Sequence, residues 1–263
     1  MKKLTTILCH PSRIGIYFLD RWYTILGIWL SFFIISFSLF AVKDLAKPSF
    51  DNNYTNSFAE VIYINDDLNE LIYKDNKLED INLKIETDYG VVYFNQAGIL
   101  NTYAGQSMIL VFGQEKASIY NGVVKLGEVS YNNLGINDFS LSKAKNGSVS
   151  DRLSFYSLVN NVIKSGDKSY RTLNLLYDVF QFIIFYFVAV LIAYFTGFVV
   201  NPLIERKIRF KLSCYDSMIY LVLSWISVLY GVKWIGYVAL IMPLIFAALT
   251  FSHIRKVKVR RNM

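Results

Sequence analysis

The chain has 263 residues, of which 54% are hydrophobic and only 18% are charged. Soluble domains carry about 25% charged residues, so this composition indicates a membrane protein. It argues against a disordered chain, a coiled coil and a repeat array, and two cysteines are too few for a disulfide scaffold. The formal net charge is +7. The distribution of the charged residues along the chain decides how this net charge is interpreted.

The first apolar run, residues 22–42, contains no charged side chain and directly follows Asp20-Arg21. A helix that crosses a bilayer needs about 20 residues, so we predict a first transmembrane helix here. Its apolar core is too long for a cleaved signal peptide, and we interpret it as an uncleaved signal anchor. The cytoplasmic leader, residues 1–21, is expected either to lie along the inner membrane surface as an interfacial helix or to be a short lead-in.

Three more transmembrane helices are predicted in the second half of the chain. Residues 175–200 form the second, whose charge-free part ends just before the helix stop Asn201-Pro202. Residues 214–252 would measure about 58 Å as one helix, nearly twice the hydrocarbon thickness of about 30 Å. Because Gly231-Val232-Lys233 interrupts this run, we predict a hairpin made of the third and fourth transmembrane helices.

The basic residues gather in three segments, which are the leader, the loop 201–213 and the tail 253–263. These segments carry thirteen Lys and Arg against two acids, whereas residues 43–174 carry thirteen basic and sixteen acidic residues. If the chain crosses the membrane four times, all three basic segments lie on the same side of it. An excess of Lys and Arg marks the cytoplasmic side of a membrane protein. We therefore predict a multi-pass protein of the bacterial plasma membrane with both termini in the cytoplasm. The positive charge then reports topology, and no nucleic-acid partner is expected.

Residues 43–174 are less apolar and richer in turn residues than the rest of the chain. We predict that they form a small extracytoplasmic α+β domain, inserted between the first and second of the four transmembrane α-helices. Its opening stretch, residues 47–57, is predicted to be a linker. A helix is expected at residues 151–164, with a cap at Ser150.

The strands of this domain are predicted from short β-rich runs separated by turn residues. Asp88-Tyr89-Gly90 and Tyr120-Asn121-Gly122-Val123 predict two hairpin turns. The expected strands are residues 61–64, 81–85, 91–94, 108–112 and 123–129.

The chain offers few side chains for catalysis. Its two histidines, His10 and His253, fall at the predicted cytoplasmic boundary, so a histidine triad or a zinc site is not expected in the domain. Cys9 and Cys214 are predicted on or near the same face as reduced thiols. No metalloprotease, nucleophile-elbow, dinucleotide or P-loop motif occurs. We predict no enzymatic activity, no cofactor and no metal.

Three groupings in the domain are interpreted as surface features. In three places a serine precedes a lysine by three residues. A Ser-Lys dyad needs a lysine that is shielded from water, and the surroundings of these pairs are polar, so we expect no dyad. These pairs are Ser140 and Lys143, Ser142 and Lys145, and Ser165 and Lys168. A cluster of acids lacks the order of a calcium loop; its members are Asp66, Asp67, Glu70, Asp75, Glu79 and Asp80. A tyrosine-lined sugar cleft stays open as an alternative to plain sheet surface, with Tyr63, Tyr73, Tyr93, Tyr103, Tyr120 and Tyr131 as its candidates.

Two acids near the membrane core are the candidate site residues, because ionisable groups there are functional hypotheses by default. Asp178 stands one position outside the charge-free part of the second span, and we expect it close to Arg171 and the outer surface. Asp216 is predicted one turn into the third span, near Lys211 and Arg209 and at a favourable helix N-terminus. Each is expected to reach water or a basic neighbour, and since they lie at opposite faces, they do not form a relay.

Three stretches of the chain form a recognisable set, namely HPSRIGIYFLDRW before the first span, MILVFGQEKASIYNGVVKLGEVSY in the domain, and IRFKLSCYDSMIYLVLSW entering the third span. They resemble a family of Gram-positive membrane proteins, the maltodextrin utilisation protein MalA type, whose domain is of unknown function. The resemblance implies an integral plasma-membrane protein associated with maltodextrin uptake genes. It implies no active site, and no functional residue is carried over.

The leading hypothesis is a non-enzymatic membrane accessory protein for maltodextrin uptake, with an extracytoplasmic domain that binds a ligand or a partner. The expected partners are the lipid bilayer, subunits of a sugar ABC transporter and further copies of this chain. One alternative is a membrane sensor or regulator of envelope or sugar status. Another is a small oligomeric transporter.

Overall fold

The computed structural model describes residues 2–46, 48–79, 81–94 and 108–261. The chain divides into two units, each with its own core. The helical unit comprises Met1–Ala46 and Leu175–Met263, and the α/β unit comprises Lys47–Asn174. The α/β unit is therefore an insertion into the sequence of the helical unit.

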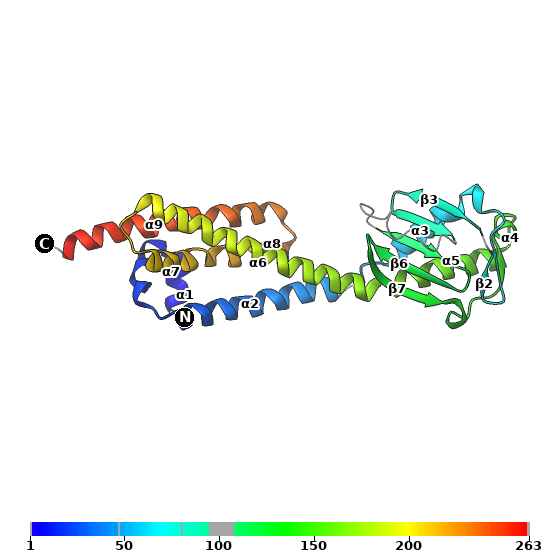
Figure 1. Ribbon diagram of the computed structural model, residues 1–263, viewed down its shortest axis with the longest axis horizontal. Helices are drawn as coiled ribbons and strands as arrows, with labels where there is room; N and C mark the ends of the chain where they lie inside the picture. Colours follow the sequence, from blue (N-terminus) through cyan, green and yellow to red (C-terminus); the bar gives the residue numbers. More distant parts are fainter. Residues whose placement is uncertain (1, 47, 80, 95–107, 262–263) are drawn as a thin grey trace. The chain divides into compact units, whose positions relative to one another are not determined.

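Among the residues that the structure describes, four helical stretches are long and apolar enough to cross a membrane, namely α2, α6, α7 together with α8, and α9. A helix suits such a stretch because every backbone N–H and C=O is then bonded within the segment. Figure 1 shows these helices running along the helical unit. The elements are α1 (Lys2–Cys9), the 3₁₀ segment η1 (Pro11–Leu19), α2 (Trp22–Leu45), α6 (Asp167–Val200), α7 (Arg206–Asp216), α8 (Met218–Tyr230) and α9 (Lys233–Arg261).

The predicted helical hairpin is confirmed. Helix α8 ends at Tyr230, and Gly231 caps it in the left-handed conformation with φ of 66°. Helix α9 begins at Lys233 and contains Pro243 in its interior. The second predicted span also ends as expected, since α6 stops at Val200, immediately before Asn201-Pro202.

Two segments of the helical unit contain more helix than predicted. The expected basic loop 201–213 is largely helix α7, which begins at Arg206. Arg and Lys are good helix formers, and Arg209 and the unbroken run Leu212–Asp216 are buried, so packing supports this helix on more than one side. Likewise, α9 continues through the expected tail 253–263 as far as Arg261.

The leader is an integral part of the helical core. It folds as α1 and η1, and its side chains Ile7 and Ile14 are 1% and 0% exposed. Both belong to the same apolar cluster as residues of α2, α6, α8 and α9. The short lead-in does not describe this arrangement, because these side chains are buried against protein. Ile16 and Leu19 of the leader are 64% and 76% exposed, and the interfacial position of the leader stays a prediction.

The described residues of the α/β unit form two β-sheets, which are antiparallel except for one strand pair, and three α-helices. The larger sheet has the strand order β3-β4-β5-β6-β7, in which β4 and β5 are parallel, and the smaller has the order β2-β1-β8. The strands are β1 (Ile72–Lys74), β2 (Lys77–Leu78), β3 (Leu83–Thr87), β4 (Gly90–Phe94), β5 (Ile109–Phe112), β6 (Lys116–Asn121), β7 (Val124–Ser130) and β8 (Phe139–Ser140). The helical elements are α3 (Asn52–Tyr63), η2 (Asp66–Leu68), η4 (Tyr131–Asn133), α4 (Leu141–Lys145) and α5 (Val149–Ser165).

One face of the larger sheet forms the core of the α/β unit. Val92, Leu110 and Ile119 point to this face and share a cluster with Phe58 of α3 and Phe155 of α5. The alternate residues of the central strands form a smaller cluster on the opposite face, namely Val91, Tyr93 and Ile109 with Val111 and Tyr120. Figure 1 shows α3 and α5 beside the sheet that they cover.

Two predictions for the start of this domain were wrong. The stretch 47–57 is not a simple linker, and residues 61–64 are not a strand, because helix α3 spans Asn52–Tyr63. Asp51 caps this helix by accepting a hydrogen bond from the Tyr54 amide at 2.7 Å. Phe58, Ala59 and Ile62 then form one apolar face, which packs into the core.

The remaining strand predictions agree with the structure within two residues, and both hairpin turns are confirmed. Thr87 pairs with Gly90, and Asn121 pairs with Val124. The predicted helix is α5, but its cap is Ser148 rather than Ser150, since the Ser148 hydroxyl accepts a hydrogen bond from the Asp151 amide at 3.4 Å. Strands β1, β2, β6 and β8 were not among the predicted strands.

We predict that Gly127→Ala destabilises the α/β unit by about 1–3 kcal/mol, the range for overpacking. A Cβ at Gly127 would lie 2.7 Å from the backbone carbonyl of Ser165, where β7 approaches the end of α5. Thermal unfolding of the detergent-purified chain, followed by circular dichroism, measures the effect. Gly27→Ala is the control, because its Cβ would meet nothing within 4 Å. An unchanged transition in Gly127→Ala would contradict this close approach.

Candidate functional site

Asp178, the first candidate, is half of an interhelical ion pair. The Lys43 ammonium at the end of α2 bonds to the Asp178 carboxylate of α6, and it also lies 3.6 Å from Asp44. The expected neighbour Arg171 pairs instead with Asp167 at 2.8 Å, one helical turn away. Asp178 therefore joins α2 to α6, and this contact explains its charge without a catalytic or transport role.

Asp216, the second candidate, is completely buried in the helical unit, with 0% of its surface exposed. Its Oδ1 lies 2.7 Å from the Thr250 hydroxyl of α9, and its Oδ2 has no hydrogen-bond partner. The expectation that it reaches water or a basic neighbour was wrong. Because α7 begins at Arg206, Asp216 is the last residue of that helix rather than a residue in its first turn.

Arg209 does not pair with Asp216. Its guanidinium donates to the carbonyls of Pro202 at 3.0 Å and Ile204 at 2.8 Å, closing the turn between α6 and α7. The same group lies over the rings of Tyr194 and Phe198, at 5.4 and 5.0 Å from their centroids. Arg209 is 3% exposed, so these contacts replace part of the water that a buried cation loses, while its Nε has no hydrogen-bond partner among the described residues.

Lys211 also turns away from Asp216 and takes part in a second polar cluster, which sequence reasoning missed. Its ammonium donates to the Asp20 carbonyl at 2.7 Å. The Asp20 carboxylate accepts hydrogen bonds from Lys3 and from the Tyr215 hydroxyl. Lys3 further lies 4.7 Å from the centre of the Tyr17 ring. This Asp20 cluster joins α1, the end of η1 and α7, and its one signal in the sequence is an acid placed directly before the first apolar run.

A further polar contact lies between apolar helices. Trp225 of α8 donates its indole N–H to the Ser36 hydroxyl of α2 at 2.6 Å. Hydrogen bonds of this kind hold helices together where lipid supplies no hydrophobic driving force. The Phe32 and Trp225 rings stack beside it with centroids 5.0 Å apart.

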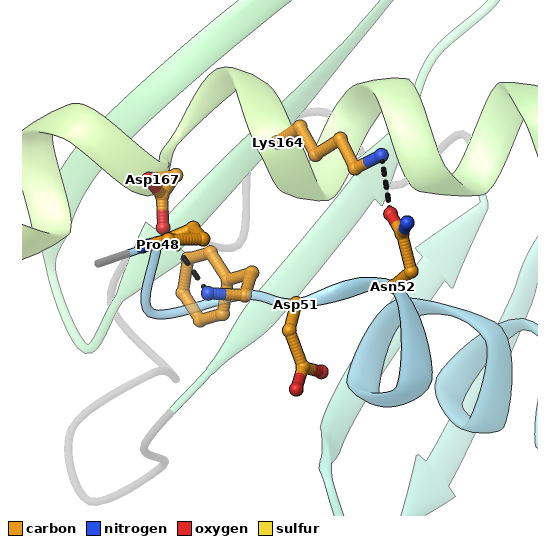
Figure 2. A pocket seen from close by; sticks show the side chains of 6 residues that line it. Pro48, Asp51, Asn52, Lys164 and Asp167 are labelled. Atoms are coloured by element: carbon orange, nitrogen blue, oxygen red, sulfur yellow. Dashed lines mark hydrogen bonds between the residues drawn. The ribbon is translucent and has the colours of Figure 1, made fainter.

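The α/β unit contains a pocket of about 450 Å³ where its chain begins, lined by Pro48, Phe50, Asp51, Asn52, Lys164 and Asp167. Figure 2 shows hydrogen bonds from Lys164 to Asn52 and from the backbone beside Pro48 to Asp167. Asp167 accepts from the amides of Ser49 at 2.7 Å and Phe50 at 3.1 Å, and Lys164 donates to Asn52 at 2.9 Å. These contacts fasten the segment before α3 to α5 and α6, so we interpret the pocket as structural.

The other groupings in this unit do not converge on a site. Lys145 donates to the Asn65 carbonyl at 2.7 Å and lies 3.5 Å from Asp66, so it serves as a contact of η2. In the residues that the structure describes, no group of three His, Cys, Asp or Glu side chains is placed to hold a metal ion; Asp80 lies outside them. The cysteines Cys9 and Cys214 are free, the first exposed and the second buried.

The tyrosines do not line a cleft together. Tyr73, Tyr93 and Tyr131 are buried in sheet or core positions, and Tyr103 lies outside the described residues. The Tyr131 hydroxyl donates to the Gly113 carbonyl at 2.9 Å, and burial raises the pKa of this phenol. A tyrosine held in this way stabilises the fold and is not available to bind a sugar.

Asp216 is accordingly the candidate functional residue. It combines an ionisable group, complete burial and an oxygen atom without a hydrogen bond, in a helical unit whose other described charges are paired, bonded to carbonyls or exposed. Comparisons with protein-family models, with curated proteins and with solved structures found no match.

We predict that Arg209→Lys destabilises the helical unit by about 1–3 kcal/mol. A lysine keeps the charge but loses the planar guanidinium, whose Nη2 bonds both carbonyls and whose plane contacts two rings. Thermal unfolding in detergent measures the change. Arg206→Lys is the matched control, because Arg206 is exposed three residues earlier on the same helix. Equal transitions for the two variants would contradict the role given to Arg209.

Proposed function

We propose that this protein is a non-enzymatic integral membrane accessory protein, which carries a ligand- or partner-binding domain on the outer side of a bacterial plasma membrane. Its task would be to assist a maltodextrin uptake system. The proposal for the sugar rests on the family resemblance of three sequence stretches.

One observation supports the domain-carrying role most directly. Helix α6 runs without interruption from Asp167 to Val200. Its first turns contribute Tyr170 and Leu173 to the packing of the α/β core, whereas Phe182 and Tyr186 lie in the core of the helical unit. The other connection is α2, which precedes the α/β unit. Two apolar helices therefore flank a separately folded domain, which is the layout of a membrane-held binding module.

The distribution of charge supports an orientation with both termini in the cytoplasm. The basic residues gather in the leader and around α7 and the end of α9, whereas residues 43–174 have an excess of acids. These basic segments alternate with the four apolar helices in the way that the positive-inside rule requires.

This orientation predicts which cysteines a membrane-impermeant maleimide labels in intact cells. Val123 is 67% exposed in the β6–β7 hairpin, so Val123→Cys is expected to be labelled from outside. The exposed native Cys9 is expected to react only after the membrane is permeabilised. Labelling of the wild-type chain in intact cells, together with protection of Val123→Cys, would contradict the orientation.

The accessory role predicts a defect specific to maltodextrin. Deleting the gene is expected to lower growth on maltodextrin, maltodextrin uptake or transporter abundance, and to leave growth on glucose unchanged. The full chain should restore the phenotype, whereas a chain without residues 47–174 should not. Unchanged growth, uptake and transporter abundance in the deletion strain would contradict the accessory role.

A membrane sensor is the second candidate, and the arrangement of α5 and α6 favours it. Only Gly166 separates these two helices, so a change in the packing of α5 has a short covalent path to the apolar part of α6. Crosslinking in cells, followed by purification of the intact protein in mild detergent, distinguishes the candidates. Sugar-transporter subunits would support the accessory protein, and a kinase, protease or transcriptional regulator would support the sensor.

A further inference from the structure

Three oxygen atoms from distant parts of the chain meet in the core of the helical unit. The Thr250 hydroxyl of α9 lies 2.7 Å from Asp216 Oδ1 and 2.8 Å from the Pro11 carbonyl oxygen. Pro11 is the first residue of η1, so this chain of atoms joins the leader, the end of α7 and α9. Thr250 and Asp216 are both 0% exposed.

The number of protons shared by these three oxygen atoms decides whether Asp216 is ionised or neutral. A hydroxyl group has one proton to donate, and a carbonyl oxygen can only accept. If the carboxyl of Asp216 were ionised, Thr250 would face two acceptors and could satisfy only one of them. A proton on Asp216 Oδ1 completes both hydrogen bonds, because Asp216 then donates to Thr250 and Thr250 donates to Pro11.

No cation offsets a negative charge at this position among the described side chains. On the elements packed around Asp216, Arg209 bonds to carbonyls, and Lys211 and Lys3 bond to Asp20. Arg13 of η1 and His253 of α9 are exposed. The other ionisable side chains there are one thiol and three phenols, none of which carries a positive charge in any state; they are Cys214, Tyr17, Tyr215 and Tyr220. An ionised Asp216 would therefore be a buried charge with one hydrogen bond at most, which is a costly arrangement.

We infer that Asp216 is a buried proton-binding site, in which its neutral carboxyl donates to Thr250 and Thr250 donates to the Pro11 carbonyl, so that the bound proton holds the leader against α9. This inference concerns the helical unit and is independent of the proposed role in maltodextrin uptake.

Release of the proton from Asp216 changes the hydrogen bonding between α9 and the leader. When Asp216 gives its proton to water, the carboxylate becomes an acceptor and competes with Pro11 for the Thr250 hydroxyl. The Pro11 carbonyl then loses its bond to the Thr250 hydroxyl, and with it η1 loses this hydrogen bond to α9. Occupancy of the site is thus coupled to docking of residues 11–19.

Infrared difference spectroscopy of the detergent-purified full chain tests the protonation state. The wild-type protein at neutral pH is expected to show the C=O stretching band of a protonated carboxylic acid, and Asp216→Asn is expected to remove it. Asp178→Asn is the matched control and should keep the band, because Asp178 is ion-paired with Lys43. Absence of the band from the wild-type protein, or its persistence in Asp216→Asn, would overturn the inference.

Hydrogen exchange of residues 11–19, measured by mass spectrometry, tests the coupling to the leader. Thr250→Val is expected to speed this exchange on the order of tenfold, as for the loss of one hydrogen bond. Asp216→Asn should stay close to wild type, because a neutral amide can still donate to Thr250. Thr196→Val is the control, since the Thr196 hydroxyl donates to the Ile192 carbonyl of its own helix. Equal exchange in the two threonine variants would overturn the coupling.

A further result would also overturn the inference. If hydrogen exchange of residues 11–19 depends on the sodium concentration and the wild-type protein lacks the carboxylic acid band, the site binds a cation and not a proton.

Discussion

The helical unit depends on satisfying polar groups inside an apolar structure. In a bilayer, water does not compensate a backbone or side-chain group that lacks a partner, so such groups must bond within the protein. Four long helices solve this for the backbone. The side chains solve it through a few specific contacts, such as Trp225 with Ser36 and Arg209 with the carbonyls of the α6–α7 turn.

These contacts explain why the leader belongs to the helical core. Asp20 draws Lys3 and Tyr215 together, and Thr250 bonds to the Pro11 carbonyl. Each polar contact lies beside apolar packing, with Ile7 and Ile14 buried in the same cluster as the long helices. The leader thus closes one end of the helical unit, and its position depends on side chains that lie some 200 residues later in the sequence, such as Tyr215.

The features that the sequence predicts well are the local ones. A charge-free run of residues is long enough to identify a spanning helix, and Asn121-Gly122 marks a hairpin turn without knowledge of the rest of the fold. The α3 error shows the limit of such reasoning. Three asparagines suggested a linker, but the Asp51 cap and the apolar face of Phe58 and Ile62 outweigh them once a core is present.

The candidate site could be predicted only as a list of acids. Asp178 meets Lys43, which is 135 positions away, and Asp216 meets Thr250, which is 34 positions away. Their roles follow from which neighbour the fold brings to each of them. An acid beside a lysine is an ordinary ion pair, whereas a buried acid beside one hydroxyl needs a proton, and no pattern along the chain separates these two cases.

The central claim is that the four apolar helices lie in a bilayer and that the α/β unit lies outside it. Hydrogen exchange of the full chain in lipid nanodiscs tests this claim most directly. We expect the amides of α2, of α8, of α9 up to Ile254 and of α6 from residue 179 onward to exchange far more slowly than those of α3, because lipid shields their hydrogen bonds from water. Exchange of these segments as fast as that of α3 would contradict the claim.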